Sequence, residues 1–529
     1  MDGLGRQRRP RRRTGHQQRR GGLRLVDVSR AAGAGRHLWK IYQDIGLGLD
    51  AAGVWGFTND PYIGNYRDNA LLYFHQYQNA QPSNPLYDKA RTGTNIAAGG
   101  TLFDVLRDDV RRNTLPQVSW IVSPEAFSEH GNWPANYGAW YISQVLDALT
   151  ANPAVWSKTA LFVTYDENDG FFDHMVPPTP PRSPAEGGST VDASDEIFAG
   201  SPGNPSGPYG LGVRVPMIVV SPWSRGGWVC SEVFDHTSLI RFIERRFAPG
   251  RPGLIESNIT AWRRAVCGDL TSAFDFATPD VTRVALPDTG AYEPRDNERH
   301  PDYVPVPPTQ QAVPAQERGL RPARAVPYVL QAGGSVHAAQ GTFRIDFANA
   351  GEAGACFHVR SGNTPDGPWT YTVEAGRSLS SSWNVGAATQ GRYDLSVYGP
   401  NGFLRSFRGN ASPGAKANLD VDASYDVDGH GIGLLVTNRG PVPCRVTGAS
   451  AHDQRSLVRL LRPGQSFRER WSVRSSFGWY DLALEVDTDT DFLRRLAGHV
   501  ENGRDSASDP ALGGIGHRTP AANAVSALA

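Results

Sequence analysis

Carboxylates and a histidine follow one apolar run in the stretch Thr159 to His174, which reads TALFVTYDENDGFFDH. The run Ala160–Val163 is short, rich in strand formers and not alternating, which is typical of a strand buried on both faces. Asp166 and Glu167 come soon after it. Ligands of open α/β sheets bind beyond the carboxyl ends of the strands, so both carboxylates would stand at a ligand site.

Two adjacent carboxylates with a histidine close by, here His174, suit a hard divalent cation and a phosphate or sulfate ester. The alternative is a solvated acidic loop after a core strand, and composition alone does not decide between them. The identity of the metal is not readable, because carboxylates favour hard ions without choosing among them.

The elements that would position this stretch are two more strands and a helix. The sequence predicts strands at Val118–Val122 and Met217–Val220, and an amphipathic helix at Gly138–Thr150. The strand–helix–strand order would give a right-handed crossover. We therefore expect these strands and Leu161–Tyr165 to be neighbouring central strands, with Asp166 and its neighbour at a cleft.

Two further histidines follow elements of this kind. His130 lies on a polar loop beyond the Val118–Val122 strand, where a lone histidine is more often structural than catalytic. His236 lies near the start of a helix at Leu239–Phe247, where anions are favoured. The alternative for the pair Asp235-His236 is a simple helix-capping motif.

Composition limits the classes of function. A chain of 529 residues is too long for one core and indicates two to four domains. Its formal net charge is zero, so we expect no nucleic-acid partner. The four cysteines show neither metal-site spacing nor a disulfide framework, and no apolar run is long enough to span a membrane.

The first residues differ from the rest, because Met1–Gly22 holds eight arginines and almost nothing apolar. This segment could be a disordered basic arm, and no hydrophobic stretch follows the arginines as an export signal requires. We favour out-of-frame translation or a misplaced start. The expected segments are 1–37 (anomalous basic segment), 38–277 (catalytic domain), 278–327 (Pro-rich linker), 328–411 and 416–500 (two repeats), and 501–529 (disordered tail).

An internal repeat defines the last third of the chain. We call residues 328–411 repeat 1 and residues 416–500 repeat 2. The matching positions are Asn349 and Asn438, Cys356 and Cys444, Gly376 and Gly464, Trp383 and Trp471, Tyr393 and Tyr480, and Arg405 and Arg494. Short alternating strands with Gly and Pro turns predict two small β-sandwiches, with the cysteines as equivalent core positions. The aperiodic segment 177–209 predicts a long surface loop, a specificity element or lid near the site.

Several motifs carry a resemblance to a known family. YDENDGFFDHMVPPTPP, PEAFSEHGNWP, GAWYISQVLDALTANPAVWSKT and RVPMIVVSPWSRGGWVCSEVFDHTSLIRFIERRF resemble the bacterial phosphatidylcholine-type phospholipase C family, within the alkaline-phosphatase-like superfamily. The resemblance runs from Trp39 to Val500 and includes the paired repeats.

The resemblance implies an α/β fold with an alkaline-phosphatase-like central sheet flanked by helices, followed by two small β-sandwich domains. It implies metal-assisted hydrolysis of phosphatidylcholine, or sphingomyelin, to diacylglycerol and phosphocholine. Asp166 and Glu167 would hold a divalent metal ion, and His130 would bind a phosphoryl oxygen or protonate the leaving group. His174 and His236 are candidates for either role. The phospholipid would be met at a membrane surface, and intact relatives would be secreted or periplasmic.

The resemblance also implies residues that this sequence does not show. Related enzymes carry an upstream Glu-Asn metal-binding pair and a Thr or Ser nucleophile, and no ENRSFDHYFG-like stretch occurs here. We therefore expect only part of the active site and poor turnover by the chain as written. The alternatives are an acid phosphatase-like phosphomonoesterase, and an inactive product whose β-domains bind membrane or glycan.

Overall fold

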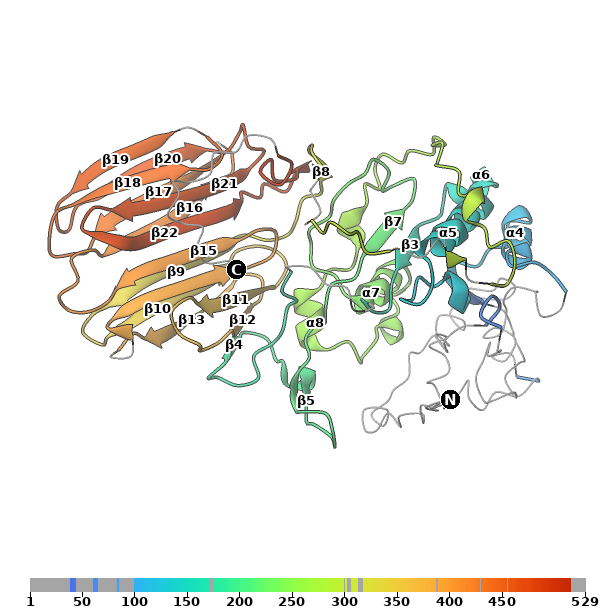
Figure 1. Ribbon diagram of the computed structural model, residues 1–529, viewed down its shortest axis with the longest axis horizontal. Helices are drawn as coiled ribbons and strands as arrows, with labels where there is room; N and C mark the ends of the chain where they lie inside the picture. The colour runs from blue at the N-terminus through green and yellow to red at the C-terminus, as the bar shows by residue number, and fades with distance from the viewer. Residues whose placement is uncertain are drawn as a thin grey trace.

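A computed structural model of the chain describes residues 39–43, 60–64, 83–84, 99–168, 170, 175–298, 300–301, 306–312, 317–386, 389–428, 430–453 and 455–514. These residues form two parts that lie side by side along the long axis of the molecule (Figure 1). The α/β part (the described residues up to 301) mixes helices and short strands, and the β part (residues 317–514) is made almost wholly of antiparallel strands. Within the described ranges, no helix is both long and apolar enough to cross a bilayer.

The α/β part contains short strands and a few helices. Its strands are β1 Trp39–Tyr42, β2 Val118–Ile121, β3 Leu161–Thr164, β4 Gly187–Ser189, β5 Ile197–Phe198, β6 Gly207–Pro208 and β7 Met217–Val220. Its helices are α4 Asp104–Arg111, α5 Ala135–Thr150, α6 Pro153–Trp156, α7 His236–Phe247 and α8 Ala261–Val266. Single 3-10 turns lie at Glu125–Phe127, Ser194–Glu196, Pro252–Leu254, Thr271–Ala273 and Gly290–Tyr292.

The core of the α/β part lies around α5. One face of this helix buries aromatic side chains, among them Tyr137, Trp140 and Tyr141, against Leu106 and Val110 of α4. The helix thus spaces its apolar residues at three- and four-residue intervals, as the sequence predicts for an amphipathic helix.

The strands pair differently from the prediction of three neighbouring central strands. β3 and β7 do pair, antiparallel, with Leu161 opposite Val220. β2 instead pairs in parallel with β1, with Val118 opposite Trp39. Since β2 and β3 belong to different sheets among the described residues, the crossover expected between them does not apply. We predicted no strand at the position of β1. In the structure, β1 pairs with the edge of β2 at which we expected β3.

The prediction that the Ala160–Val163 run forms a strand buried on both faces is also wrong. All four residues of β3 are half-buried, and Ile218 of β7 is 55% exposed. One face is covered, because the Phe162 ring meets that of Phe242 of α7 edge-on at 5.1 Å. An apolar run without alternation therefore did not distinguish a strand covered on one side from one covered on two.

The segment 177–209 is more ordered than a plain surface loop. It contains β4, β5 and β6, and β5 pairs with β6. β4 pairs in parallel with β12 of the β part, with Gly188 opposite Tyr371. The segment is therefore attached to the β part by backbone hydrogen bonds.

The β part consists of strands joined by tight turns. These are β8 Pro322–Ala323, β9 Leu330–His337, β10 Thr342–Asn349, β11 Ala355–Ser361, β12 Trp369–Val373, β13 Arg377–Asn384, β14 Arg392–Tyr398, β15 Leu404–Asn410, β16 Leu419–Asp426, β17 Gly431–Asn438, β18 Cys444–Ser450, β19 Ser456–Leu461, β20 Ser466–Ser472, β21 Trp479–Val486, β22 Asp489–His499 and β23 Ser506–Ala507.

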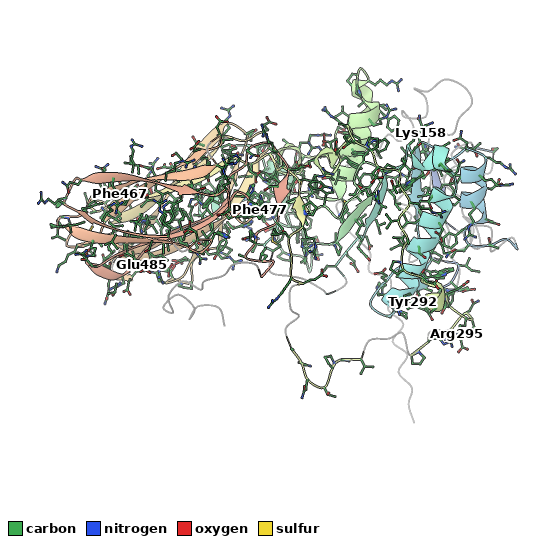
Figure 2. All side chains as sticks on the ribbon, turned by 90° about the horizontal axis from the view of Figure 1, so that it is seen from above. Lys158, Tyr292, Arg295, Phe467, Phe477 and Glu485 are labelled. Carbon is green, nitrogen blue, oxygen red and sulfur yellow. The ribbon has the colours of Figure 1, made fainter. Side chains whose placement is uncertain are left out.

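The two repeats have equivalent strands and separate cores but share one sheet. Three strands of each repeat form their own small sheet, β13-β10-β9 in repeat 1 and β16-β17-β20 in repeat 2. The other strands of both repeats, with β4, make one continuous sheet of nine, joined where β15 pairs with β22. Two clusters of buried apolar residues, one in each repeat, fill the space between the sheets. Figure 2 shows Phe467 and Glu485 toward the far end of this β part and Phe477 toward the α/β part.

Positions matched by the repeat have matching environments. Trp383 and Trp471 are both buried, on β13 and β20. Asn349 donates from Nδ2 to the carbonyls of Ala353 and Val373 at 2.7 and 3.1 Å. Asn438 donates in the same way to Val442 and Leu461 at 2.9 and 3.1 Å. Cys356 and Cys444 are buried free thiols.

The matched arginines cross from one repeat to the other. Arg405 of repeat 1 donates to the Tyr480 hydroxyl of repeat 2 at 3.0 Å. Arg494 of repeat 2 donates to the Tyr393 hydroxyl of repeat 1 at 2.7 Å. Both guanidinium groups are almost fully buried, and Arg494 also lies 4.4 Å from the Phe492 ring centroid. Each repeat therefore completes the polar network of the other.

The linker and the tail meet each other. β8, within the segment 278–327, pairs with β23 within the segment expected to be a disordered tail. Arg324 bonds Asp505 at 2.9 Å, and its guanidinium lies 4.0 Å from the Trp228 ring centroid. Residues 501–514 are thus held by strand pairing, which their small, polar composition did not indicate.

Candidate active site

His236 is held at the first residue of α7 by a capping box. The Asp235 carboxylate accepts from the Ser238 amide at 3.2 Å, and the Ser238 hydroxyl accepts from the Asp235 amide at 3.1 Å. The capping alternative of the sequence is therefore correct for Asp235. Capping by Asp235 does not exclude a role for His236. The cap fixes the start of the helix, from which the His236 side chain projects.

The His236 ring reaches the end of β3. Its Nε2 lies 2.8 Å from the carbonyl oxygen of Tyr165. Since a carbonyl can only accept, Nε2 carries the hydrogen and Nδ1 is the nitrogen left to accept or donate. His236 is an exposed residue and lines a cleft.

Tyr165 joins a third element to this point. Its hydroxyl donates to Glu129 Oε2 at 2.7 Å, on the loop that follows β2. The start of α7, the end of β3 and the loop after β2 thus converge on one residue. The sequence analysis assigned neither Tyr165 nor Glu129 to the site. The position of Tyr165 directly before Asp166 was the only signal.

Glu129 occupies an unusual backbone position. Its φ of 62° is left-handed, a conformation that non-glycine residues rarely adopt. Gly138 of α5 leaves room for the side chain, since a Cβ there would lie 2.3 Å from Glu129 Cγ. Burial raises the pKa of the Glu129 carboxyl, and the bond from Tyr165 opposes that rise. Backbone strain and burial of this kind are common at functional sites.

The two carboxylates follow Tyr165 directly. Asp166 and Glu167 are both exposed, on a bend at the end of β3. They lie at the same end of the strand as the His236 contact, as expected for a ligand site. His174 lies outside the described residues, as do Asp169 and Asp173.

His130 is exposed on the loop beside Glu129. Its Nδ1 lies 2.6 Å from Asn132 Oδ1, and its amide donates to the Ser128 hydroxyl at 3.2 Å. The contact from this loop to Tyr165 is made by Glu129 rather than by His130.

The described residues do not make a complete metal site. They contain no group of three or more His, Cys, Asp or Glu side chains that could hold a metal ion. Two exposed carboxylates suit a hard cation, but such ions take about six oxygens. Asp166 and Glu167 could therefore supply only part of a coordination shell.

A cleft of about 2320 Å³ lies next to these groups and reaches the β part. His236, Asp235, Thr164 and Met175 line it, whereas Asp166 and Glu167 do not. The cleft contacts the candidate site through His236.

Comparison with known proteins identifies the family of the chain. The Phosphoesterase family model matches residues 34–248, and the model of the bacterial phospholipase C C-terminal domain matches residues 322–410 and 419–499. The non-hemolytic phospholipase C of Burkholderia pseudomallei is 60% identical over 477 residues, which cover 90% of this chain and 68% of that protein. The non-hemolytic and hemolytic phospholipases C of Pseudomonas aeruginosa are 43% and 40% identical, with the same coverage of 90% and 68%.

The two models together define a phosphoesterase followed by a duplicated phospholipase C C-terminal domain. The chain belongs to the bacterial phospholipase C family that includes the haemolytic and non-haemolytic enzymes. Its enzyme class is therefore that of the phosphoric diester hydrolases.

Proposed function

We propose that this protein hydrolyses phosphatidylcholine, or sphingomyelin, releasing phosphocholine and leaving diacylglycerol or ceramide. The observation that carries the proposal is the convergence of three family motifs at Tyr165, the residue between the end of β3 and Asp166, which both His236 and Glu129 contact. Family membership supports the reaction class, and this convergence supports the choice of residues.

His236 is proposed to transfer a proton or to bind a phosphoryl oxygen. With Nε2 bonded to the Tyr165 carbonyl, Nδ1 is the nitrogen that can face the substrate. In the imidazolium form Nδ1 would donate to a phosphoryl oxygen or to the departing alcohol oxygen. A histidine suits this work because its ring can both accept and donate a proton.

Glu129 and Tyr165 would keep that histidine in place. The hydroxyl of Tyr165 is fixed on Glu129, and its carbonyl is fixed on His236, so the two bonds orient one residue from both ends. His130, on the same loop, is proposed to bind a phosphoryl oxygen, and His174 is a further candidate.

Asp166 and Glu167 are proposed to contribute oxygens to a divalent metal ion, with the remaining ligands coming from outside the described residues. Such an ion would lower the pKa of the attacking group and take up charge on the phosphoryl oxygens. Equilibrium dialysis followed by metal analysis tests this directly. Asp166→Asn should lower the amount of retained metal, and equal retention by the variant would remove Asp166 from the site.

The substrate would be met at a membrane surface, by an enzyme acting outside the cytoplasm. A paired assay tests the function, using a choline phosphodiester and the corresponding phosphomonoester. Turnover of the diester alone supports the proposal, and turnover of the monoester alone supports an acid phosphatase. No turnover of either by the folded chain, with retained vesicle binding, would favour a non-catalytic membrane-binding protein.

A further inference from the structure

Helix α8 lies between the candidate site and the β part. Trp262 is fully buried, and its Nε1 donates to the Thr372 hydroxyl of β12 at 2.9 Å. The carbonyl of Ala265 accepts from the Gly354 amide, also of repeat 1, at 2.9 Å. The position of α8 is therefore set by repeat 1, which is far from it in the sequence.

Arg263 extends from this helix toward the site. Its Nη1 bonds Asp235 Oδ2 at 2.7 Å, and its Nε and Nη2 bond the two oxygens of Glu196 at 2.9 and 3.1 Å. Nη2 also donates to the Gly210 carbonyl at 3.0 Å. The side chains of Asp235 and Glu196 are only 4% and 5% exposed, so solvent screens these pairs little.

Asp235 is the link from Arg263 to His236. One of its oxygens takes the bond from Arg263, and the other accepts from the Ser238 amide and the Thr237 hydroxyl at the start of α7. The guanidinium of Arg263 therefore fixes Asp235, the residue that caps α7. His236 is the first residue of that helix. A group that must be held within a fraction of an ångström depends on supports of this kind.

We propose that Arg263 is a positioning residue for His236, and that through α8 it makes the geometry of the candidate site depend on the docked β part. The proposal rests on the function proposed above for His236. It also gives the segment 177–209 a role, because Glu196 and Gly210 lie at that segment and share the same guanidinium.

The next residue on the helix provides a matched control. Arg264 bonds both oxygens of Glu244 at 2.9 Å and the Glu256 carbonyl at 2.7 Å. It too ties α8 to α7, but near the C-terminal end of α7 and away from His236. Arg263 and Arg264 thus differ mainly in which end of α7 they hold.

The experiment compares Arg263→Met, Arg263→Lys and Arg264→Met in the full chain. Two quantities are measured: turnover of a choline phosphodiester, and the ring signal of His236 in an NMR spectrum of histidine-labelled protein, identified by its loss in His236→Gln. We expect Arg263→Met to lower kcat by about 10- to 100-fold and to shift or broaden the His236 signal. The effects of Arg263→Lys should lie between those of Arg263→Met and the unaltered chain. A lysine ammonium keeps the charge but cannot reproduce the planar contacts of the guanidinium with two carboxylates.

Arg264→Met should lose a comparable amount of thermal stability and leave both the His236 signal and kcat within about twofold. The proposal is overturned if the two methionine variants move the His236 signal equally, or if Arg263→Met moves neither quantity. If the unaltered chain shows no turnover, the proposed function fails, and the NMR comparison still decides the role of Arg263. If Arg263→Met does not fold, Arg263→Lys against Arg264→Lys gives the same decision.

Discussion

The two parts of the molecule use their polar side chains differently. In the β part, Arg405 and Arg494 are almost fully buried, and each donates to a tyrosine hydroxyl and a carbonyl of the opposite repeat. In the α/β part, Asp166, Glu167 and His236 are exposed at the end of a half-buried strand. The two buried arginines hold the fold, whereas the three exposed side chains are available for a ligand.

This difference predicts which substitutions should lower stability and which should lower activity. A buried polar group that loses its partners costs free energy of folding, whereas an exposed one does not. An exposed carboxylate at a strand end contributes little to folding and much to binding. Four substitutions test this separation.

The largest effect is expected from Asp166→Asn. Removing one charge from the proposed metal and phosphate site should lower turnover by about 10³-fold, the scale of losing one electrostatic contact to the reacting group. The free energy of unfolding should change by less than about 0.5 kcal/mol, because the side chain is exposed. Steady-state kinetics and urea unfolding measure the two quantities. Asp366→Asn, at an exposed carboxylate of the β part, should change neither.

Arg494→Ala should lower stability and leave turnover almost unchanged. It leaves a cavity beside four aromatic rings and removes the partner of the Tyr393 hydroxyl, so we expect a loss of about 3 kcal/mol of unfolding free energy. Below the unfolding transition, kcat should stay within about twofold. The neighbouring Arg495→Ala, which breaks a partly exposed pair with Asp481, should cost less than about 1 kcal/mol. Equal losses in the two variants would contradict a structural role for the crossed arginine.

The third prediction compares the repeats through His358, whose counterpart in repeat 2 is Val446. Burial lowers the pKa of His358 to about 4. The unfolded chain, with a pKa of about 6.5, binds the proton first, so stability is lost as the pH falls from about 6.5 to about 4. The slope is about 1.4 kcal/mol per pH unit, or about 2 kcal/mol by pH 5.

Unfolding free energies measured at pH 7 and pH 5 test this. His358→Val, which installs the residue of repeat 2, should lose about 2 kcal/mol less on acidification than the unaltered chain. If His358→Val and the unaltered chain lose the same unfolding free energy between pH 7 and pH 5, His358 is not the group that causes the loss.

The smallest effect is expected from Tyr165→Phe. The variant keeps the carbonyl that accepts from His236 but loses the bond to Glu129. We expect turnover to fall by about 10-fold and stability by about 1 kcal/mol, because a partly buried carboxylate loses its donor. Tyr209→Phe, which removes an exposed hydroxyl bonded to Pro205, is the control and should leave turnover unchanged. Full activity of Tyr165→Phe would mean that Glu129 does not support the site.

Local patterns were sufficient wherever a feature depends on neighbours along the chain. The repeat in the sequence predicted that Trp383 and Trp471 are equivalent, and both are buried on corresponding strands. The acidic residues after an apolar run predicted carboxylates at the end of a strand, which is where Asp166 and Glu167 lie. The pair Asp235-His236 predicted a helix start, and α7 begins at His236.

The choice of partners was decided only by the tertiary structure. The matched positions of Arg405 and Arg494 are visible in the sequence, but that each serves the other repeat follows from the pairing of β15 with β22. The pairing of β1 with β2, and the bond from Tyr165 to Glu129 across 36 positions, likewise join distant segments. Short-range periodicity determines which residues form a strand or helix and which face is apolar. It carries no information about which distant element meets that face, because that choice depends on the packing of the whole chain.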